Sequence, residues 1–151
     1  MKLTTKGRYA VTAMLDVAIH QVTSQSGVVP LADIASRQKL SQAYLEQLFS
    51  KLRKKGLVGS SRGPQGGYSL VKEAGQITVA EIIFAIDEPI DTTRCGGAAN
   101  CQKGERCMTH QLWSELNGVI FKFLASVSLK TLMENKNQVT IKQSEMRNCE
   151  Q

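Results

Sequence analysis

The sequence lacks any long apolar run. No hydrophobic stretch in its 151 residues approaches the roughly 20 residues that cross a bilayer. The charged opening, residues 1–8, is not followed by the apolar segment and cleavage site of a secretory signal peptide. We therefore expect a cytoplasmic protein with no membrane partner.

Signatures of enzyme chemistry are also missing. The chain has no nucleotide-binding glycine fingerprint, no nucleophile elbow and no second redox-cofactor motif. These absences argue against an enzyme, and a small cluster-dependent redox catalyst is the one enzyme class that stays open. The 42% hydrophobic content is enough for a folded core, which excludes a disordered chain.

Acidic residues are scarce in the first half of the chain. Residues 1–75 carry eleven Lys or Arg against four Asp or Glu, whereas residues 76–151 carry eight against nine. The net charge of +6 therefore belongs to the N-terminal half. A basic surface of this kind suits a polyanion, and double-stranded DNA is the expected partner.

Two helices joined by a tight turn are predicted after a first helix at Thr5 to His20. Pro30 suits the first turn of one, and Ser41 suits the N-cap of the next, which should stop at Gly56. This arrangement is a helix-turn-helix. The alternative for its second helix is a plain solvated outer face.

A β-hairpin is predicted over residues 57–71, with Arg62 at its tip. Helix-turn-helix plus hairpin is the winged-helix arrangement, in which the tip Arg suits a minor groove. Basic and polar groups at the start of the first helix are placed to hold phosphates. The candidate DNA-binding residues are Lys6, Tyr9, Gln42, Ala43, Tyr44, Glu46, Gln47 and Arg62.

A capping box at Thr78 opens a short helix through Ile86, and Thr109 is placed to cap a long one. Apolar residues recur along the long helix at alternating spacings of three and four, as in a paired helix. We therefore expect a homodimer, the alternative being a helix buried within the monomer. The candidate dimerisation residues are Trp113, Leu116, Ile120, Phe123 and Val127.

Three cysteines and a histidine, Cys95, Cys101, Cys107 and His110, share one short glycine-bearing loop. Thiolates and imidazole together select zinc, copper(I) or an iron–sulfur centre. The loop lacks the C-x2-4-C knuckle of structural zinc sites, which favours a cluster over zinc. A disulfide or inert thiols stay open, although a reducing compartment disfavours them.

The predicted fold class is mainly α with a small β-hairpin wing. We divide the chain into a winged helix-turn-helix domain at 1–88, a cluster-binding loop at 89–110, a dimerisation helix and following turn at 111–134, and a flexible tail at 135–151. Cys149 lies in that tail and is expected to be a free thiol rather than a ligand.

Four segments together resemble the bacterial iron–sulfur cluster regulators: residues 3–16, 44–49, 62–68 and the cysteine/histidine loop. The resemblance covers residues 1 to about 134. It implies a dimeric winged-helix transcription factor on pseudo-palindromic operators, which represses or activates cluster-assembly genes. It also implies a [2Fe-2S] cluster and a scaffold protein that donates it.

Carried over by position, the resemblance makes the loop residues Cys95, Cys101, Cys107 and His110 the cluster ligands. It makes Gln47 a base-reading residue, Arg62 and Gly63 wing contacts, and Glu46 the residue that makes sequence choice depend on the cluster. Two departures concern sequence preference: Ala43 stands where a serine is expected, and Gln65 interrupts a run of glycines.

Two alternatives remain beside this resemblance. One is a nitric-oxide-responsive iron–sulfur repressor, a relative with a similar three-cysteine loop. His110, two residues beyond Cys107, favours the cluster regulator instead. The other is a zinc-bound winged-helix DNA-binding protein.

Overall fold

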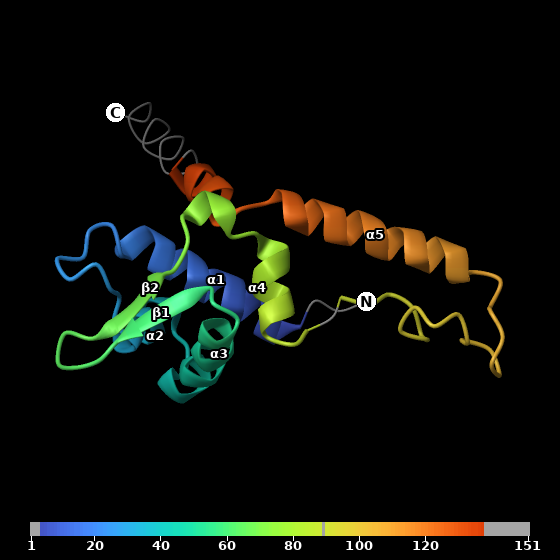
Figure 1. Cartoon of the computed structure of the whole chain (residues 1–151), viewed down its shortest axis with the longest axis horizontal. Helices are drawn as coiled ribbons and strands as arrows, with labels where there is room; N and C mark the ends of the chain where they lie inside the picture. The colour runs from blue at the N-terminus through green and yellow to red at the C-terminus, as the bar shows by residue number, and fades with distance from the viewer. Residues whose placement is uncertain (1–3, 89, 138–151) are drawn as a thin grey trace, which may run out of the picture.

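The computed structural model describes residues 4–88 and 90–137. Its elements form a helical domain that carries a two-stranded hairpin, and a long helix that extends away from this domain (Figure 1). This is the predicted mainly α class with a small β wing. No helix in the described ranges combines the length and apolarity needed to span a bilayer.

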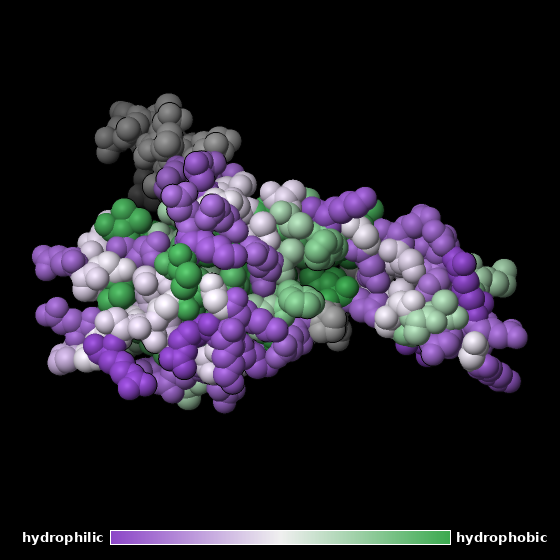
Figure 2. Space-filling view, in the orientation of Figure 1, coloured by the Kyte–Doolittle hydropathy of each residue, from purple (hydrophilic) through white to green (hydrophobic). Residues whose placement is uncertain are grey.

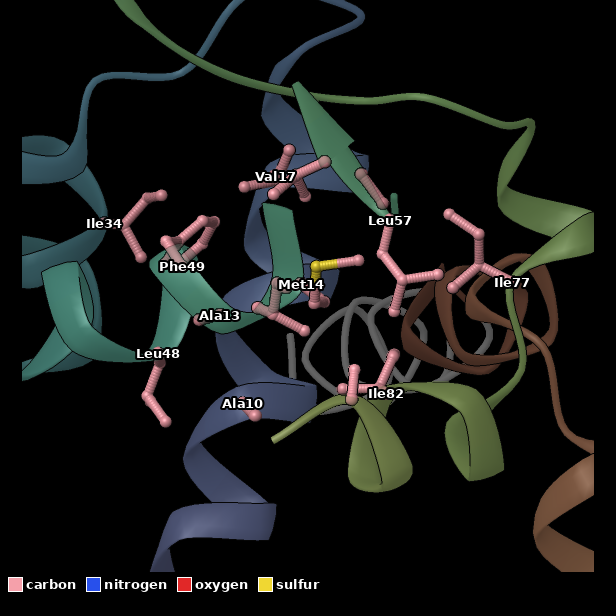
Figure 3. Packing of buried hydrophobic residues seen from close by; sticks show 14 of the residues in the cluster. Ala10, Ala13, Met14, Val17, Ile34, Leu48, Phe49, Leu57, Ile77 and Ile82 are labelled. Carbon is pink, nitrogen blue, oxygen red and sulfur yellow. The ribbon is translucent and has the colours of Figure 1, made fainter. Parts of the chain in front are cut away.

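Helix α1 (Thr5–His20) lies at the centre of the domain. Thr4 caps its N-terminus by accepting a hydrogen bond from the Gly7 N–H, and one face of the helix is fully buried. Alanines on that face let other elements approach closely, while larger side chains fill the space between them. Figure 3 shows Ala10, Ala13, Met14 and Val17 facing the surrounding elements.

The helix-turn-helix consists of α2 (Leu31–Gln38) and α3 (Gln42–Lys54). Lys39 ends α2 in a left-handed conformation with φ 54°, and the Ser41 hydroxyl caps α3 by accepting from the Tyr44 N–H. Pro30 precedes α2 at the N-cap position, so its placement in the first turn was wrong by one residue. The buried residues of α3 are the four predicted from its spacing: Leu45, Leu48, Phe49 and Leu52.

The predicted hairpin consists of strands β1 (Val58–Ser61) and β2 (Gly67–Leu70), which pair antiparallel with Val58 opposite Leu70. Tyr68 in β2 exchanges two backbone hydrogen bonds with Val29, at N···O distances of 2.8 and 2.9 Å. Its ring also packs on Phe49 of α3, with centroids 4.7 Å apart. The wing is therefore fixed directly against the second helix of the helix-turn-helix.

A short 3-10 helix, η1 (Ala74–Gln76), leads to α4 (Val79–Ala85), where Thr78 and Glu81 form the predicted capping box. The segment 90–109 then leads away from the domain, and helix α5 (His110–Ser126) runs back alongside it (Figure 1). Thr109 occupies the N-cap position, but its side chain does not cap the helix. It accepts instead from the Trp113 indole N–H at 3.1 Å.

After α5 the chain returns to the domain. The Val127 carbonyl accepts from the Val79 N–H at 2.9 Å, and the Leu129 N–H donates to the Ile77 carbonyl at 3.0 Å. Residues 129–137 are helical, and Leu129 is fully buried in the core. Residues 135–137, which we assign to the tail from the sequence, are thus part of a helix, while residues 138–151 with Cys149 lie outside the described residues.

One buried carboxylate joins α1 to α2. The Asp16 side chain is fully buried and accepts from Arg37 Nη2 at 2.7 Å, Arg37 Nε at 3.1 Å and Gln38 Nε2 at 2.7 Å. Burial raises the pKa of Asp16, but the hydrogen bonds from Arg37 and Gln38 and the neighbouring positive charge outweigh it, so the pKa lies below its usual value. The carboxylate thus fixes the angle at which the helix-turn-helix begins.

We expect Asp16→Ala to lower the free energy of unfolding by about 2–3 kcal/mol at neutral pH, because it removes hydrogen bonds to a charged group. The stabilisation by ionised Asp16 should be complete above pH 3.8, the ordinary pKa of an aspartate. It should vanish as the pH falls through the lowered pKa of Asp16 in the folded state. Urea unfolding across this pH range measures it. Asp33→Ala, an exposed acid of α2, is the control and should cost less than about 1 kcal/mol. Equal losses in the two variants would contradict the assignment.

Candidate metal centre and nucleic-acid interface

His110 opens α5 and is one of two buried polar side chains in the described part of the chain. Its Nδ1 lies 3.5 Å from Cys95 Sγ and 3.8 Å from Cys101 Sγ. Its Nε2 lies 3.2 Å from the Ser114 hydroxyl, one turn further along the helix. A hydrogen on Nε2 directed at Ser114 leaves the Nδ1 lone pair facing the two sulfurs, which is the tautomer that a metal ligand needs.

The three donor atoms of Cys95, Cys101 and His110 lie within 4.8 Å of one another. Two ligands of one tetrahedral zinc, bonded at about 2.3 Å through sulfur and about 2.0 Å through nitrogen, are about 3.5 Å apart. The two measured sulfur–nitrogen distances are close to this value. The donors therefore fit a soft metal ion or one iron of a cluster, and Cys101 and His110 also line an open cavity of about 500 Å³.

Cys107 is outside this three-donor group, although it lines the same cavity. Its backbone N–H donates to Cys101 Sγ at 3.2 Å, and its own sulfur lies 3.8 Å from the Thr109 hydroxyl. Of the four ligands predicted from the sequence, the structure thus brings three together and leaves the fourth beside them.

The environment of the thiols favours thiolate at Cys95. Burial raises the pKa of Cys95, but hydrogen bonds from the Ala99 and Gly97 N–H groups and from Thr93 outweigh it and lower the pKa to about 6. Gly96 and Gly97 both have positive φ, at 62° and 84°, a backbone form that cups N–H groups around an anion. Cys95 is therefore deprotonated at neutral pH, as a metal ligand must be.

The other two thiols influence each other. A hydrogen bond between Cys101 and Cys107 raises the pKa of Cys101 and lowers that of Cys107. The thiolate form is therefore disfavoured at Cys101 and favoured at Cys107, and a metal that binds Cys101 must displace its proton.

Sequence reasoning missed the polar residues that surround these donors. Ser114 and Asn117 follow His110 at i+4 and i+7, on the same face of α5, and Asn117 contacts Asp91 and Thr92 in the ligand-bearing segment. The helical spacing from His110 was the signal that could have found them.

The candidate DNA-contacting residues fall into two places. Gln42, Glu46, Arg62 and Gly63 line one groove between α3 and the hairpin, together with Arg53, which donates to the Ser60 hydroxyl at 3.2 Å. Ala43 and Gln47 are exposed on the same helix.

The second place is the start of α1, where the structure puts Lys6 and Tyr9. Lys6 is half-buried, and the Tyr9 ring meets the Tyr44 ring edge-on, with centroids 6.0 Å apart. Tyr9 and Tyr44 therefore form one aromatic contact between α1 and the N-terminal turns of α3.

The candidate dimerisation residues lie on the extended helix. Trp113 is 39% and Phe123 65% exposed, whereas Leu116 and Ile120 are half-buried. Val127 lies just beyond the end of α5. Figure 2 shows hydrophobic surface where α4 meets the C-terminal half of α5. A small hollow there is lined by Phe84, Phe121 and Leu124.

Two contacts connect α1 and α3 to the start of the ligand-bearing segment. Lys51 of α3 pairs with Asp87 at 3.0 Å, and Thr4 at the start of α1 donates a hydrogen bond to Glu88. The Lys51–Asp87 pair is exposed, so it contributes little to stability. The pair joins α3, which carries candidate DNA-contacting residues, to the chain that leads to the candidate metal centre.

Comparison with known proteins agrees with this geometry. The family described as Rrf2, iron-dependent transcriptional regulator, matches residues 3–135. The chain is 60% identical to the HTH-type transcriptional regulator IscR of Photorhabdus laumondii over 93% of this chain and 84% of that protein, and 59% identical to that of Xenorhabdus nematophila over the same shares.

Solved structures give the same result. The IscR of T. potens has a TM-score of 0.74 at 36% identity, covering 92% of this chain and 90% of its own. CymR, the global cysteine regulator of B. subtilis, has a TM-score of 0.75 at 35% identity, covering 89% and 98%. The predicted winged-helix fold and the resemblance to iron–sulfur cluster regulators are thereby confirmed. The chain belongs to the Rrf2 family of transcriptional regulators.

Proposed function

We propose that this transcriptional regulator senses iron–sulfur status through a [2Fe-2S] cluster held by Cys95, Cys101, Cys107 and His110. The observation that carries the proposal is the convergence of Cys95, Cys101 and His110 within 4.8 Å, with Cys107 lining the same cavity. When bound, such a cluster would signal that the cell has iron–sulfur clusters to spare. Ligation by one neutral imidazole makes it less negative than all-cysteine ligation and raises its reduction potential.

A zinc centre is the second candidate, and one observation favours it. Three donor atoms, of Cys95, Cys101 and His110, lie within 4.8 Å of one another, as do ligands that share a single tetrahedral ion. Visible absorption of the anaerobically purified protein separates the candidates, because a [2Fe-2S] protein is coloured and a zinc protein is not.

The DNA side of the proposal rests on the groove between α3 and the hairpin. Gln42, Glu46 and Gln47 would face base edges in a major groove, and Arg62 with Gly63 would contact the backbone or minor groove from the wing. Two copies joined through the exposed apolar residues of α5 would present two such surfaces to a pseudo-palindromic operator. A scaffold protein that donates the cluster is a further proposed partner.

Communication between the metal centre and α3 is proposed to act through Glu46. A carboxylate beside phosphates and base acceptors is repelled, unless it meets a cytosine amino group or turns away. The Lys51–Asp87 contact offers a route by which ordering of the ligand-bearing segment reaches α3. The coupling required is of the order of 1–3 kcal/mol, typical of two linked sites.

The ligand assignment predicts which cysteines matter. Replacing Cys95, Cys101 or Cys107 by Ala should abolish stable cluster binding, because each removes one thiolate of the set. Cys149→Ala is the matched control and should leave iron and sulfide per chain unchanged. Loss of the cluster in the control, with retention in a loop variant, would refute the assignment.

The wing predicts a salt-dependent contribution to operator binding. Arg62→Ala should weaken binding and reduce the slope of log affinity against log salt by about one phosphate contact. Lys72→Ala is the charge-matched control, because the Lys72 ammonium faces Glu81 at 3.5 Å. Fluorescence anisotropy at several salt concentrations measures both variants, and the stoichiometry should be two chains per operator. Salt-insensitive binding, or a 1:1 complex, would contradict the proposal.

The proposed role of Glu46 predicts a change in discrimination rather than in affinity alone. Metal-free Glu46→Ala should bind operators that otherwise demand the cluster, with little loss at sites that both forms accept. The measurement is a titration of metal-free wild type and variant against both operator classes. Identical discrimination by the two proteins would remove Glu46 from the mechanism.

A further inference from the structure

The segment that carries Cys95 is attached to α5 by a compact set of hydrogen bonds around Asn117. The Asn117 carbonyl oxygen accepts from the Thr92 N–H at 2.8 Å and lies 2.7 Å from the Thr92 hydroxyl. The Asn117 amide N–H donates to Asp91 Oδ1 at 2.9 Å. The Thr92 hydroxyl also lies 2.9 Å from the Trp113 carbonyl on the preceding turn.

Asp91 connects Asn117 to the turn that contains Cys95. The same Oδ1 accepts from the Thr93 N–H and the Thr93 hydroxyl, both at 2.7 Å. The Thr93 hydroxyl oxygen in turn accepts from the Gly97 N–H at 2.9 Å, which closes the turn around Cys95. Asn117 is therefore two hydrogen bonds away from the turn that positions the first thiolate.

Asn117 also shares a helix face with the imidazole. His110, Ser114 and Asn117 are spaced i, i+4 and i+7 along α5, so they lie in one row. Ser114 contacts His110 Nε2, and Asn117 holds the segment that brings Cys95 to His110 Nδ1. One face of α5 thus orients the His110 imidazole and also positions the Cys95 thiolate beside it.

We propose that Asn117 is a positioning residue of the metal centre, which acts by latching the Asp91–Thr93 segment to α5 so that Cys95 and His110 meet at ligand distance. The inference rests on the proposed metal centre, and it adds a residue that touches neither sulfur nor imidazole. Residues that orient metal ligands through hydrogen bonds typically change metal affinity by about 10- to 100-fold when replaced.

The test uses the metal-free full-length protein, titrated anaerobically with cobalt(II) in competition with a chelator and followed by thiolate-to-metal absorption. Asn117→Ala should weaken cobalt(II) binding by about 10- to 100-fold. Lys122→Ala, an exposed residue of the same helix, is the control and should bind as wild type does. Equal affinity of Asn117→Ala and wild type would overturn the proposal.

Conservative changes distinguish positioning from general damage to the fold. Asn117→Asp keeps the acceptor for Thr92 but sets a second carboxylate against Asp91, so it should weaken cobalt(II) binding. Asp91→Asn should change little and keep the wild-type absorption bands, because its amide oxygen can accept the same hydrogen bonds. Equal cobalt(II) affinities of Asn117→Asp and wild type, or an equal loss of affinity in the two variants, would refute the latch.

Failure of the metal centre itself gives a different result. Wild type that binds no cobalt(II) would refute the centre and the latch together. Wild type that binds, with binding abolished by Cys101→Ala but unaffected by Asn117→Ala, would keep the centre and refute the latch alone.

Discussion

The structure depends on the burial of one face of α1. Ala10, Ala13 and Ala18 keep that face narrow, so α2 and α4 approach closely, while Met14 and Val17 fill the remaining space. A larger side chain at one of the alanines would push a neighbouring element outward, because cores packed to this density do not absorb extra volume. The Asp16 carboxylate then fixes the orientation of α2 relative to α1, because it accepts three hydrogen bonds from Arg37 and Gln38. The position of α3, and with it the groove against the hairpin, follows from these two constraints.

Local patterns were enough to predict the elements of the DNA-binding half. Ser41 and Thr78 cap helices as their side-chain chemistry requires, and the apolar spacing of α3 identified its buried residues. Helix caps and apolar spacing depend on residues close together in the chain, so the sequence alone predicts them. The Asp16–Arg37 pair was not predicted, because it joins residues 21 positions apart and no periodicity marks such a contact.

At the candidate metal centre, too, features of neighbouring residues were predicted and contacts between distant residues were not. Residue type and proximity in the chain identified all four candidate ligands, and the structure brings three of them together. The separate position of Cys107 depends on backbone turns at Ala99, Lys103 and Gly104, each with positive φ, which the sequence does not specify individually. The Asn117 contacts were missed for a related reason: an asparagine on a polar helix face looks solvated until the opposing segment is in place.

Among the described residues, helix α5 contacts the domain through its C-terminal half, which packs against α4. Val127 and Leu129 hold its C-terminal end through backbone hydrogen bonds to Val79 and Ile77, while His110 lies at the opposite end. At 1.5 Å per residue, its 17 residues span about 25 Å, so a tilt of about 10° at Val127 displaces the histidine by about 4 Å. A change in the angle between α5 and the domain would therefore move His110 much further than the C-terminal end of the helix. A ligand that held His110 against segment 90–109 would set this angle, and with it the place of the apolar residues of α5 relative to the DNA-binding domain.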